Sequence, residues 1–238
     1  MPSPQPPFGR ELELLAGAEL GIIGRVAESS NLTFAVELRD GDDYAWAIYK
    51  PMAGERELWD FEPGLHARER AAFLLSEWLG WHLVPPTVVR ADGPAGIGSL
   101  QWYIEADAEH YFTLIAGHPE SHDQLLRIAV FDLVTNNTDR KSGHVLRDAE
   151  GRLWAIDHGL CFAAEPKLRT VIWDFAGEVV DDDLLADLRP LANSVPCEVA
   201  ELLTLREVEM LRRRVQQLLD RPVLPTETSP YQYPWPLV

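Results

Sequence analysis

The chain has 238 residues, of which 46% are hydrophobic and 25% charged, and its formal net charge at pH 7 is −17. This composition excludes disordered and fibrous proteins, and the length suffices for one large domain or for two small lobes that share a cleft. The excess of acids disfavours nucleic acids and anionic lipid surfaces as partners, because both would be repelled.

Other features of the composition concern the location of the protein. No apolar run approaches the ~20 residues that a membrane helix requires, so we expect no integral membrane association. Residues 1–10 are rich in proline and lack an apolar core segment, which argues against a secretory signal. The two cysteines, Cys161 and Cys197, are too few for a disulfide framework. Together these features predict a cytoplasmic protein.

The first fifty residues are predicted to form strands. Residues 12–23 have a mixed pattern, residues 32–38 alternate between apolar and polar side chains, and residues 44–49 are mainly apolar and aromatic. A Gly-Asp-Asp turn separates the last two segments. We therefore expect an antiparallel meander that begins at residue 12.

A long helix is predicted over residues 66–81. Four of its apolar side chains recur at helical spacing and should form one buried stripe, namely Ala71, Leu74, Leu75 and Trp78. Two prolines follow and end the helix. Beyond them, residues 87–90 and 99–105 are predicted strands, joined by a loop rich in glycine and proline over residues 91–98.

The second half of the chain is predicted to be mainly helical. Residues 122–134 form an amphipathic helix, and residues 181–219 are helical with breaks at Pro190 and Pro196. Residues 145–156 read as a β-hairpin around a short turn.

These elements predict an α+β fold with two lobes. Residues 1–104 would form an N-lobe with an antiparallel sheet and one long helix, and residues 105–220 a mainly helical C-lobe. Residues 221–238 contain five prolines, so we expect an extended tail that lies on the body of the protein.

Two acids stand beside the predicted hairpin, Asp139 in the sequence NTDR and Asp157 in the sequence IDHG. Phosphoryl transfer from ATP requires one carboxylate beside the attacking hydroxyl and one on the metal ion of the nucleotide. Structural alternatives exist for both, because residues 136–139 form a polar cluster that could cap a helix and an aspartate before a glycine is common in turns.

Five short segments resemble, in their order and spacing, the protein-kinase-like superfamily. The segments are YKP at 49–51, RERAA at 68–72, VPPT at 84–87, NTDR at 137–140 and IDHG at 156–159. Within the superfamily the chain is similar to the phosphatidylinositol 3-/4-kinase-like branch, which includes the HipA-related kinases, and to a family of small actinobacterial kinase-like proteins of unsettled substrate. The resemblance covers about residues 15–175 and implies an atypical bilobal kinase fold.

Lys50 and Glu69 are the candidate phosphate-binding pair. Lys50 ends a strand with apolar and aromatic neighbours, so its ammonium should leave the sheet near the cleft. In the resembled families such a lysine binds the α- and β-phosphates and a helix carboxylate holds it in place. The alternatives are a surface lysine at a strand end and a solvated glutamate paired with a neighbouring arginine.

Asp139 and Arg140 are the candidate catalytic residues. A short loop after an apolar helix can place the Asp139 carboxylate within hydrogen-bond reach of an acceptor hydroxyl, where it would act as the base or orient the hydroxyl. Arg140 either contacts a phosphate or braces Asp139, and the sequence does not decide between these roles.

Asp157 and His144 are the candidate metal ligands. The resemblance makes Asp157 the main ligand of the nucleotide's metal ion. Kinases usually place an asparagine five residues beyond the catalytic aspartate, and here that position is His144. Imidazole suits Mn²⁺ better than Mg²⁺, so His144 could ligate Mn²⁺, bind phosphate directly, leave a site for one metal, or be structural.

Two further segments are candidates for binding the nucleotide. No G-x-G-x-x-G motif is present, and in the resembled branch a serine-containing loop covers the phosphates. The loop residues here are Ser29, Ser30 and Asn31, although an ordinary hairpin turn would have the same composition. The adenine is expected to bind the backbone of Gln101, Trp102, Tyr103 and Ile104.

The sequence thus predicts an ATP-dependent kinase that uses Mg²⁺ or Mn²⁺ and phosphorylates a hydroxyl group on a protein or a small molecule. The acidic composition and the lack of a polybasic element argue against a lipid acceptor. A nucleotide-binding pseudokinase or regulatory scaffold is the main alternative, because of His144 and the short segment after Gly159. A transferase of AMP is a remote one.

Overall fold

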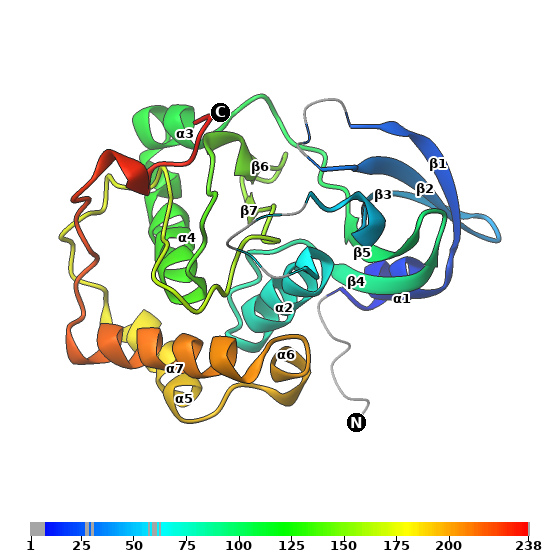
Figure 1. Cartoon of the computed structure of the whole chain (residues 1–238). Helices are drawn as coiled ribbons and strands as arrows, with labels where there is room; N and C mark the ends of the chain where they lie inside the picture. The colour runs from blue at the N-terminus through cyan, green and yellow to red at the C-terminus, as the bar shows by residue number, and fades with distance from the viewer. Residues whose placement is uncertain are drawn as a thin grey trace, which may run out of the picture.

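The computed structural model describes residues 8–26, 29, 31–56, 58, 61 and 63–237. A twisted β-sheet occupies one side of the molecule and a group of helices the other, with helix α2 between them (Figure 1). Within the described residues, no helix has both the length and the apolar character needed to cross a membrane.

The sheet is antiparallel and has the strand order β1-β2-β3-β5-β4. Its strands are β1 (Glu19–Arg25), β2 (Phe34–Asp40), β3 (Asp43–Pro51), β4 (Thr87–Gly93) and β5 (Gly96–Trp102). The first three strands form the predicted meander. The predicted loop over 91–98 is instead mostly strand, because β4 and β5 are joined by a tight turn with Gly93 paired to Gly96.

The prediction of strand from residue 12 was wrong at its start. Helix α1 (Gly9–Gly17) precedes β1 and buries Leu14 and Leu15 in the core beneath the sheet. Those adjacent leucines, with Leu12 partly buried beside them, suit one face of a helix that packs on a sheet.

Helix α2 (Leu65–Trp78) confirms the predicted long helix but uses a different buried face. Ala71 and Leu75 are buried as expected, whereas Trp78 is 43% exposed. Ala72 and Phe73 are buried as well, so the helix packs on more than one side. A broad apolar surface is what a helix needs when it contacts both a sheet and other helices.

The remaining helices gather on the other side of the molecule (Figure 1). They are α3 (Tyr111–Gly117), α4 (His122–Thr135), α5 (Asp182–Asn193), α6 (Cys197–Ala200) and α7 (Leu205–Asp220). The predicted break at Pro190 was wrong, because α5 continues through it. Buried leucines of α5, among them Leu188 and Leu191, hold the helix against its neighbours and offset the hydrogen bond that proline cannot donate.

Short elements between the helices complete the fold. Strands β6 (Val145–Arg147) and β7 (Leu153–Ala155) pair antiparallel as the predicted hairpin. The 3₁₀ turns are η1 (Met52–Gly54), η2 (Pro119–Ser121), η3 (Ser142–His144) and η4 (Pro230–Gln232).

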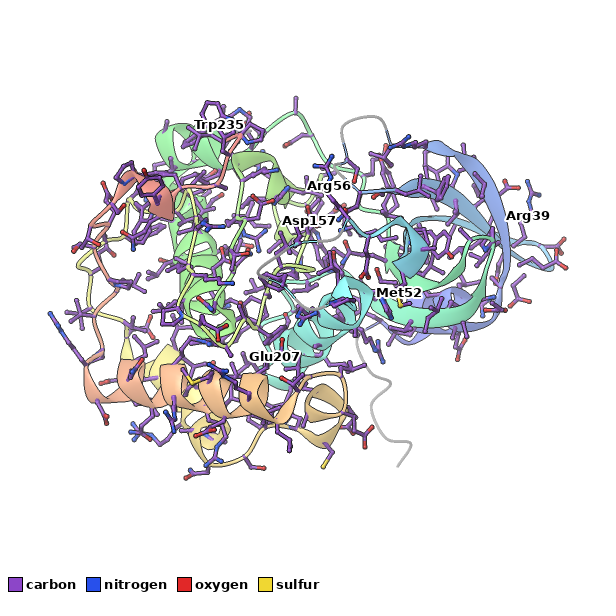
Figure 2. All side chains as sticks on the ribbon, viewed as in Figure 1. Arg39, Met52, Arg56, Asp157, Glu207 and Trp235 are labelled. Carbon is purple, nitrogen blue, oxygen red and sulfur yellow. The ribbon has the colours of Figure 1, made fainter. Side chains whose placement is uncertain are left out.

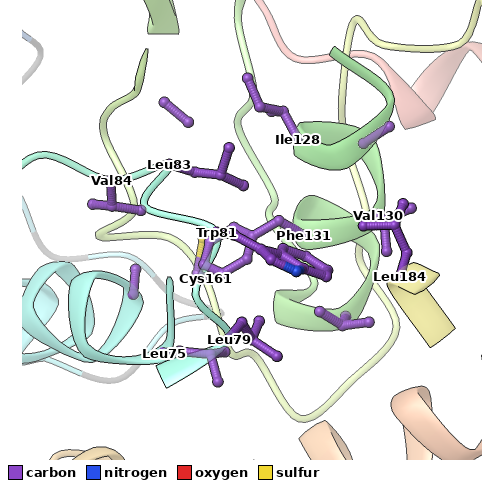
Figure 3. Packing of buried hydrophobic residues seen from close by; sticks show 14 of the residues in the cluster. Leu75, Leu79, Trp81, Leu83, Val84, Ile128, Val130, Phe131, Cys161 and Leu184 are labelled. Carbon is purple, nitrogen blue, oxygen red and sulfur yellow. The ribbon is translucent and has the colours of Figure 1, made fainter. Parts of the chain in front are cut away.

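Two apolar clusters form the core. The smaller lies between the sheet and α1, and the larger joins α2, the hairpin and the helices. Figure 3 shows Trp81 and Phe131 packed together in the larger cluster, with Leu75 and Leu79 nearby. The apolar side chains of α2 therefore belong to the same core as the helical part of the molecule.

The segment that follows α7 lies along the helical part. The backbone of Leu224 pairs with that of Gly177 and Glu178, the Gln232 carbonyl accepts a hydrogen bond from the Thr170 amide, and the Leu237 carbonyl accepts one from the Ser142 amide. The segment thereby reaches the loop that carries Asp139.

Candidate functional site

Three charged side chains from distant parts of the sequence meet where the sheet contacts the helical part. The Lys50 Nζ donates to Glu69 Oε1 at 2.5 Å and to Asp157 Oδ1 at 2.9 Å. Figure 2 labels Asp157 in this central region. Burial alone would lower the pKa of Lys50, but the two carboxylates outweigh it and raise the pKa above its ordinary value, so the lysine is charged.

The strand and the helix each orient one member of this group. Successive side chains of β3 point to opposite faces of the sheet, so Lys50 leaves the face opposite to the buried Tyr49. Glu69 lies on α2 with its side chain only 3% exposed, and its second oxygen accepts a hydrogen bond of 3.0 Å from the His158 amide. Both Glu69 oxygens are therefore satisfied, and Glu69 links β3 to the segment after β7.

Gly98 allows the close approach that this end of β3 requires. It pairs with Pro51 on the neighbouring strand, and a Cβ at this position would lie 2.5 Å from the Lys50 carbonyl oxygen. Any larger residue would push β5 away from the backbone of Lys50.

Asp157 has the left-handed backbone conformation, with φ of 61°. Aspartate is among the few residues that adopt it at modest cost, since its short side chain can bond locally. The side chain is 45% exposed. Desolvation would raise the pKa of Asp157, but the Lys50 ammonium and His144 lower it well below its usual range, so the carboxylate is ionised.

His144 lies beside Asp157, with 3.3 Å between His144 Nε2 and Asp157 Oδ2. Burial lowers the pKa of His144 to about 4 against the opposing effect of Asp157, which leaves the imidazole neutral at pH 7. A neutral ring and an ionised carboxylate are chemically suited to a divalent cation. Across the described ranges, no group of three or more His, Cys, Asp or Glu side chains is arranged to hold a metal ion by itself.

Asp139 lines the same pocket as Lys50, Glu69 and Asp157. Its carboxylate is 3.3 Å from the Lys141 Nζ, and its amide donates to the Asn137 side chain at 3.0 Å. Burial raises the pKa of Asp139 to about 6, although Lys141 opposes this effect. A carboxylate in this state can accept a proton near neutral pH.

The Arg140 side chain does not reach this pocket. It is completely buried and donates to both Asp132 oxygens at 2.8 and 2.9 Å. It also donates to the His144 and Ile156 carbonyls at 3.1 and 2.7 Å and contacts His158 Nε2 at 2.8 Å. This places Arg140 behind the site, where it ties the Asp139 loop to the segments that carry His144 and Asp157.

The predicted phosphate loop is only partly described. Ser30 lies outside the described residues, and the Ser29 hydroxyl is 2.7 Å from that of Thr33. Asn31 lines the pocket beside Lys50, and its side-chain oxygen accepts from the Arg56 amide at 3.0 Å. Of this loop, Asn31 is thus the residue that the structure brings to the other candidate residues.

The predicted adenine-binding residues divide into two groups. Trp102, Tyr103 and Ile104 line a cavity of about 620 Å³, together with Trp46 of β3 and Trp154 of β7. Gln101 does not line this cavity. Its side chain is buried and donates to the Thr87 hydroxyl at 2.9 Å, so it braces β4 against β5.

Sequence reasoning missed two residues of the pocket, Glu55 and His66. Both line it, and the His66 Nδ1 is 3.0 Å from Glu55 Oε1. Glu55 stands in an irregular loop, and His66 fits no metal-ligand spacing, so neither carried a signal in the sequence. The start of a helix at Leu65 was the available clue, because first-turn amides attract a carboxylate.

Comparison with known proteins agrees with this architecture. No family model matches the sequence. A structure of hydra Fam20 with sugar matches with a TM-score of 0.54 at 14% sequence identity, over 88% of this chain and 86% of that one. A crystal structure of the Helicobacter pylori proinflammatory kinase CtkA matches with a TM-score of 0.48 at 13% identity, over 88% and 94% of the two chains. The likeness to the Fam20 structure shows that the two chains share an α+β fold.

One curated protein is much more similar in sequence. Protein Rv2133c of Mycobacterium tuberculosis is 38% identical over 264 aligned positions, which cover 95% of this chain and 95% of the relative. Similarity of this extent over nearly the whole of both chains shows common membership, and the chain therefore belongs to the same family as Rv2133c.

Proposed function

We propose that the protein is an ATP-dependent phosphotransferase that moves the γ-phosphoryl group to a hydroxyl acceptor. The observation that carries the proposal is the contact of Lys50 with both Glu69 and Asp157, at 2.5 and 2.9 Å, in a pocket that Asp139 also lines. A fixed cation, a metal-binding carboxylate and a carboxylate for the acceptor are the parts that phosphoryl transfer requires.

The arrangement supports one placement of the nucleotide. The phosphates would lie at Lys50, and the base at the backbone of Trp102, Tyr103 and Ile104 in the aromatic cavity. Lys50 and Trp46 share one face of β3 and are four residues apart, which is about 13 Å along a strand. The nucleotide would therefore lie along β3, with Asn31 near its terminal phosphate.

Asp157 and His144 would hold Mg²⁺ or Mn²⁺. Their 3.3 Å separation and their ionised and neutral states fit a divalent cation, which would neutralise charge on the phosphates when bound. Asp139 would orient or deprotonate the acceptor hydroxyl. Arg140 would position the loop without touching the reacting groups.

The proposal also covers the branch of the kinase-like superfamily, the division of the chain into lobes and the acceptor of the phosphoryl group. We place the chain in the phosphatidylinositol 3-/4-kinase-like, HipA-related branch, with an N-lobe over 1–104, a C-lobe over 105–220 and a tail over 221–238. The acceptor is a protein or small-molecule hydroxyl in the cytoplasm, since a net charge of −17 disfavours a lipid surface.

A nucleotide-binding scaffold is the second candidate. The two candidate carboxylates already have partners within the protein: Asp157 contacts Lys50 and His144, and Asp139 contacts Lys141. A protein that only binds nucleotide would keep Asp157 functional but would have no use for Asp139 as an acceptor contact.

Ligand-induced stabilisation tests the proposal. The melting temperature of the wild type is measured with ATP and Mg²⁺ or Mn²⁺, and then that of Asp157→Asn. We expect stabilisation of the wild type and its loss in the variant. Asp92→Asn is the matched control, because Asp92 is exposed, pairs with Arg90 and lines neither cavity.

Turnover separates the two candidate functions. Release of ADP is measured for the wild type and for Asp139→Asn with a panel of hydroxyl-bearing acceptors. A phosphotransferase loses turnover in the variant while it keeps nucleotide binding. Stabilisation by ATP without any ADP release in the wild type would favour the scaffold, and unchanged stabilisation of Asp157→Asn would contradict the metal assignment.

A further inference from the structure

A glutamate and a histidine form a second polar pair in the pocket of Lys50. The His66 Nδ1 is 3.0 Å from Glu55 Oε1, and both residues line the pocket with Lys50, Asn31 and Asp157. His66 stands three residues before Glu69 on α2, so the two side chains are neighbours on one helix face. The pair is thus built into the wall that faces the candidate phosphate site.

Glu55 fixes the state of one ring nitrogen. Its two oxygens accept hydrogen bonds from the Gly64 amide at 2.9 Å and the His66 amide at 3.1 Å, at the start of α2. These bonds and that of the His66 ring outweigh burial and lower the pKa of Glu55 to about 2. An ionised carboxylate can only accept, so His66 Nδ1 carries a proton.

The other ring nitrogen, Nε2, is the atom that can contact a ligand. The His66 side chain is only 9% exposed, and in the part of the chain that the structure describes Nε2 has no hydrogen-bond partner. The ring lines the pocket, so Nε2 is the polar atom that it can offer there. An unpartnered nitrogen of a nearly buried ring, held by a carboxylate on its other side, is an oriented contact for a ligand.

The charges of the pocket indicate which ligand this contact suits. Four described lining residues are carboxylates, namely Glu55, Glu69, Asp139 and Asp157. The described lining residues that can carry positive charge are Lys50 and His66. A phosphate that enters this pocket needs donors with positive charge. An imidazolium ring donates from both nitrogens, so His66 can give one hydrogen bond to Glu55 and one to a phosphate.

We propose that His66, oriented by Glu55, donates from Nε2 to the terminal phosphate of the bound nucleotide. This rests on the proposed function, since it assigns a further contact in the same site. Lys50 would hold the inner phosphates, and His66 with Asn31 the outermost one. The consequence is a preference for nucleoside triphosphates over diphosphates that depends on His66.

The test compares two substitutions that separate the two ring nitrogens. In His66→Asn the amide nitrogen takes the place of Nδ1 and keeps the bond to Glu55 but loses the contact at Nε2. In His66→Gln the amide nitrogen takes the place of Nε2. Dissociation constants are measured by calorimetry for ADP and for the non-hydrolysable β,γ-imido analogue of ATP, each with Mn²⁺.

His66→Asn should raise the dissociation constant of the analogue by about tenfold to a hundredfold, as expected for the loss of a charge-assisted hydrogen bond. The dissociation constant of ADP should stay within about twofold of the wild-type value. His66→Gln should retain part of the preference. The matched control is His82→Asn, because His82 also pairs with a glutamate, Glu77, at 2.9 Å but lines neither cavity. It should bind both nucleotides as the wild type does.

Equal effects of His66→Asn on the analogue and ADP, or no effect on either, would overturn the assignment while leaving the proposed function intact. If the wild type binds neither nucleotide, the proposed function itself fails. If His66→Asn does not fold, the ¹⁵N signal of His66 Nε2 in the wild type decides. It should move to the protonated position with the analogue and not with ADP, and an unchanged signal would overturn the proposal.

Discussion

The replacement Arg140→Met is expected to destabilise the protein strongly. Arg140 is completely buried and makes five hydrogen bonds, two of them to Asp132. Without Arg140, the buried Asp132 carboxylate loses both bonds from the guanidinium and keeps the 2.9 Å hydrogen bond from the Asn137 side-chain amide. Breaking a buried ion pair from one side costs about 3–5 kcal/mol, because the remaining charge is uncompensated. For a chain of this length that lowers the melting temperature by roughly 10 °C.

Urea unfolding followed by tryptophan fluorescence measures this cost, since the chain has eight tryptophans. A double-mutant cycle with Asp132→Leu tests the cause. Removal of both charges should cost less than the sum of the single changes, by more than about 1 kcal/mol. The reasoning is refuted if Arg140→Met costs less than about 1 kcal/mol, or if the two changes add to within about 0.5 kcal/mol.

Three other outcomes are expected. The pKa of Glu55 is lowered to about 2, so its ionised carboxylate stabilises the folded state fully above the pKa of the unfolded chain, and this stabilisation is lost as the pH falls from about 5 to about 2. In Glu55→Gln, the free energy of unfolding should therefore decrease by about 3 kcal/mol less over this pH range than in the wild type. Asp139, with its pKa raised to about 6, must be ionised to act as a base, so turnover should fall below pH 6 with the slope of one proton, and a pH-independent rate would exclude that role. Lys50→Met should weaken the binding of ATP more than tenfold, as measured by calorimetry, because the variant lacks the ammonium of the site. Arg213→Met, at an exposed pair with Glu209 in which neither residue lines a cavity, should leave ATP binding unchanged.

Local patterns predicted the elements that carry the site. The alternation of residues 32–38 and the turn before Tyr44 gave the meander, and the turn between β6 and β7 gave the hairpin, because register and turn chemistry are encoded within a few residues. The pairing of Lys50 with Glu69 was implied by the family resemblance rather than by any local pattern, and the contact of Lys50 with Asp157 was not predicted.

Other features depend on tertiary contacts that no local pattern contains. Arg140 stood next to Asp139 in sequence and was assigned to the site, yet its partner is Asp132 on the preceding helix. The helix at residues 9–17 had a pattern too short to separate from a strand, and packing against the sheet decided its state. His66 fits no metal-ligand spacing and Glu55 stands in a loop, and it is the start of α2 that brings them together.

The contacts of the site join residues that are far apart along the chain. The Lys50 and Asp157 pair spans 107 positions, the Glu69 and His158 pair 89, and the ion pair of Arg68 with Glu207 that anchors α2 to α7 spans 139. Closing such long loops is entropically costly and is characteristic of slow folding. During synthesis, Lys50 and Glu69 leave the ribosome well before Asp157 does. The proposed nucleotide site is therefore assembled late, and binding of ATP would report completion of the whole fold rather than of any one segment.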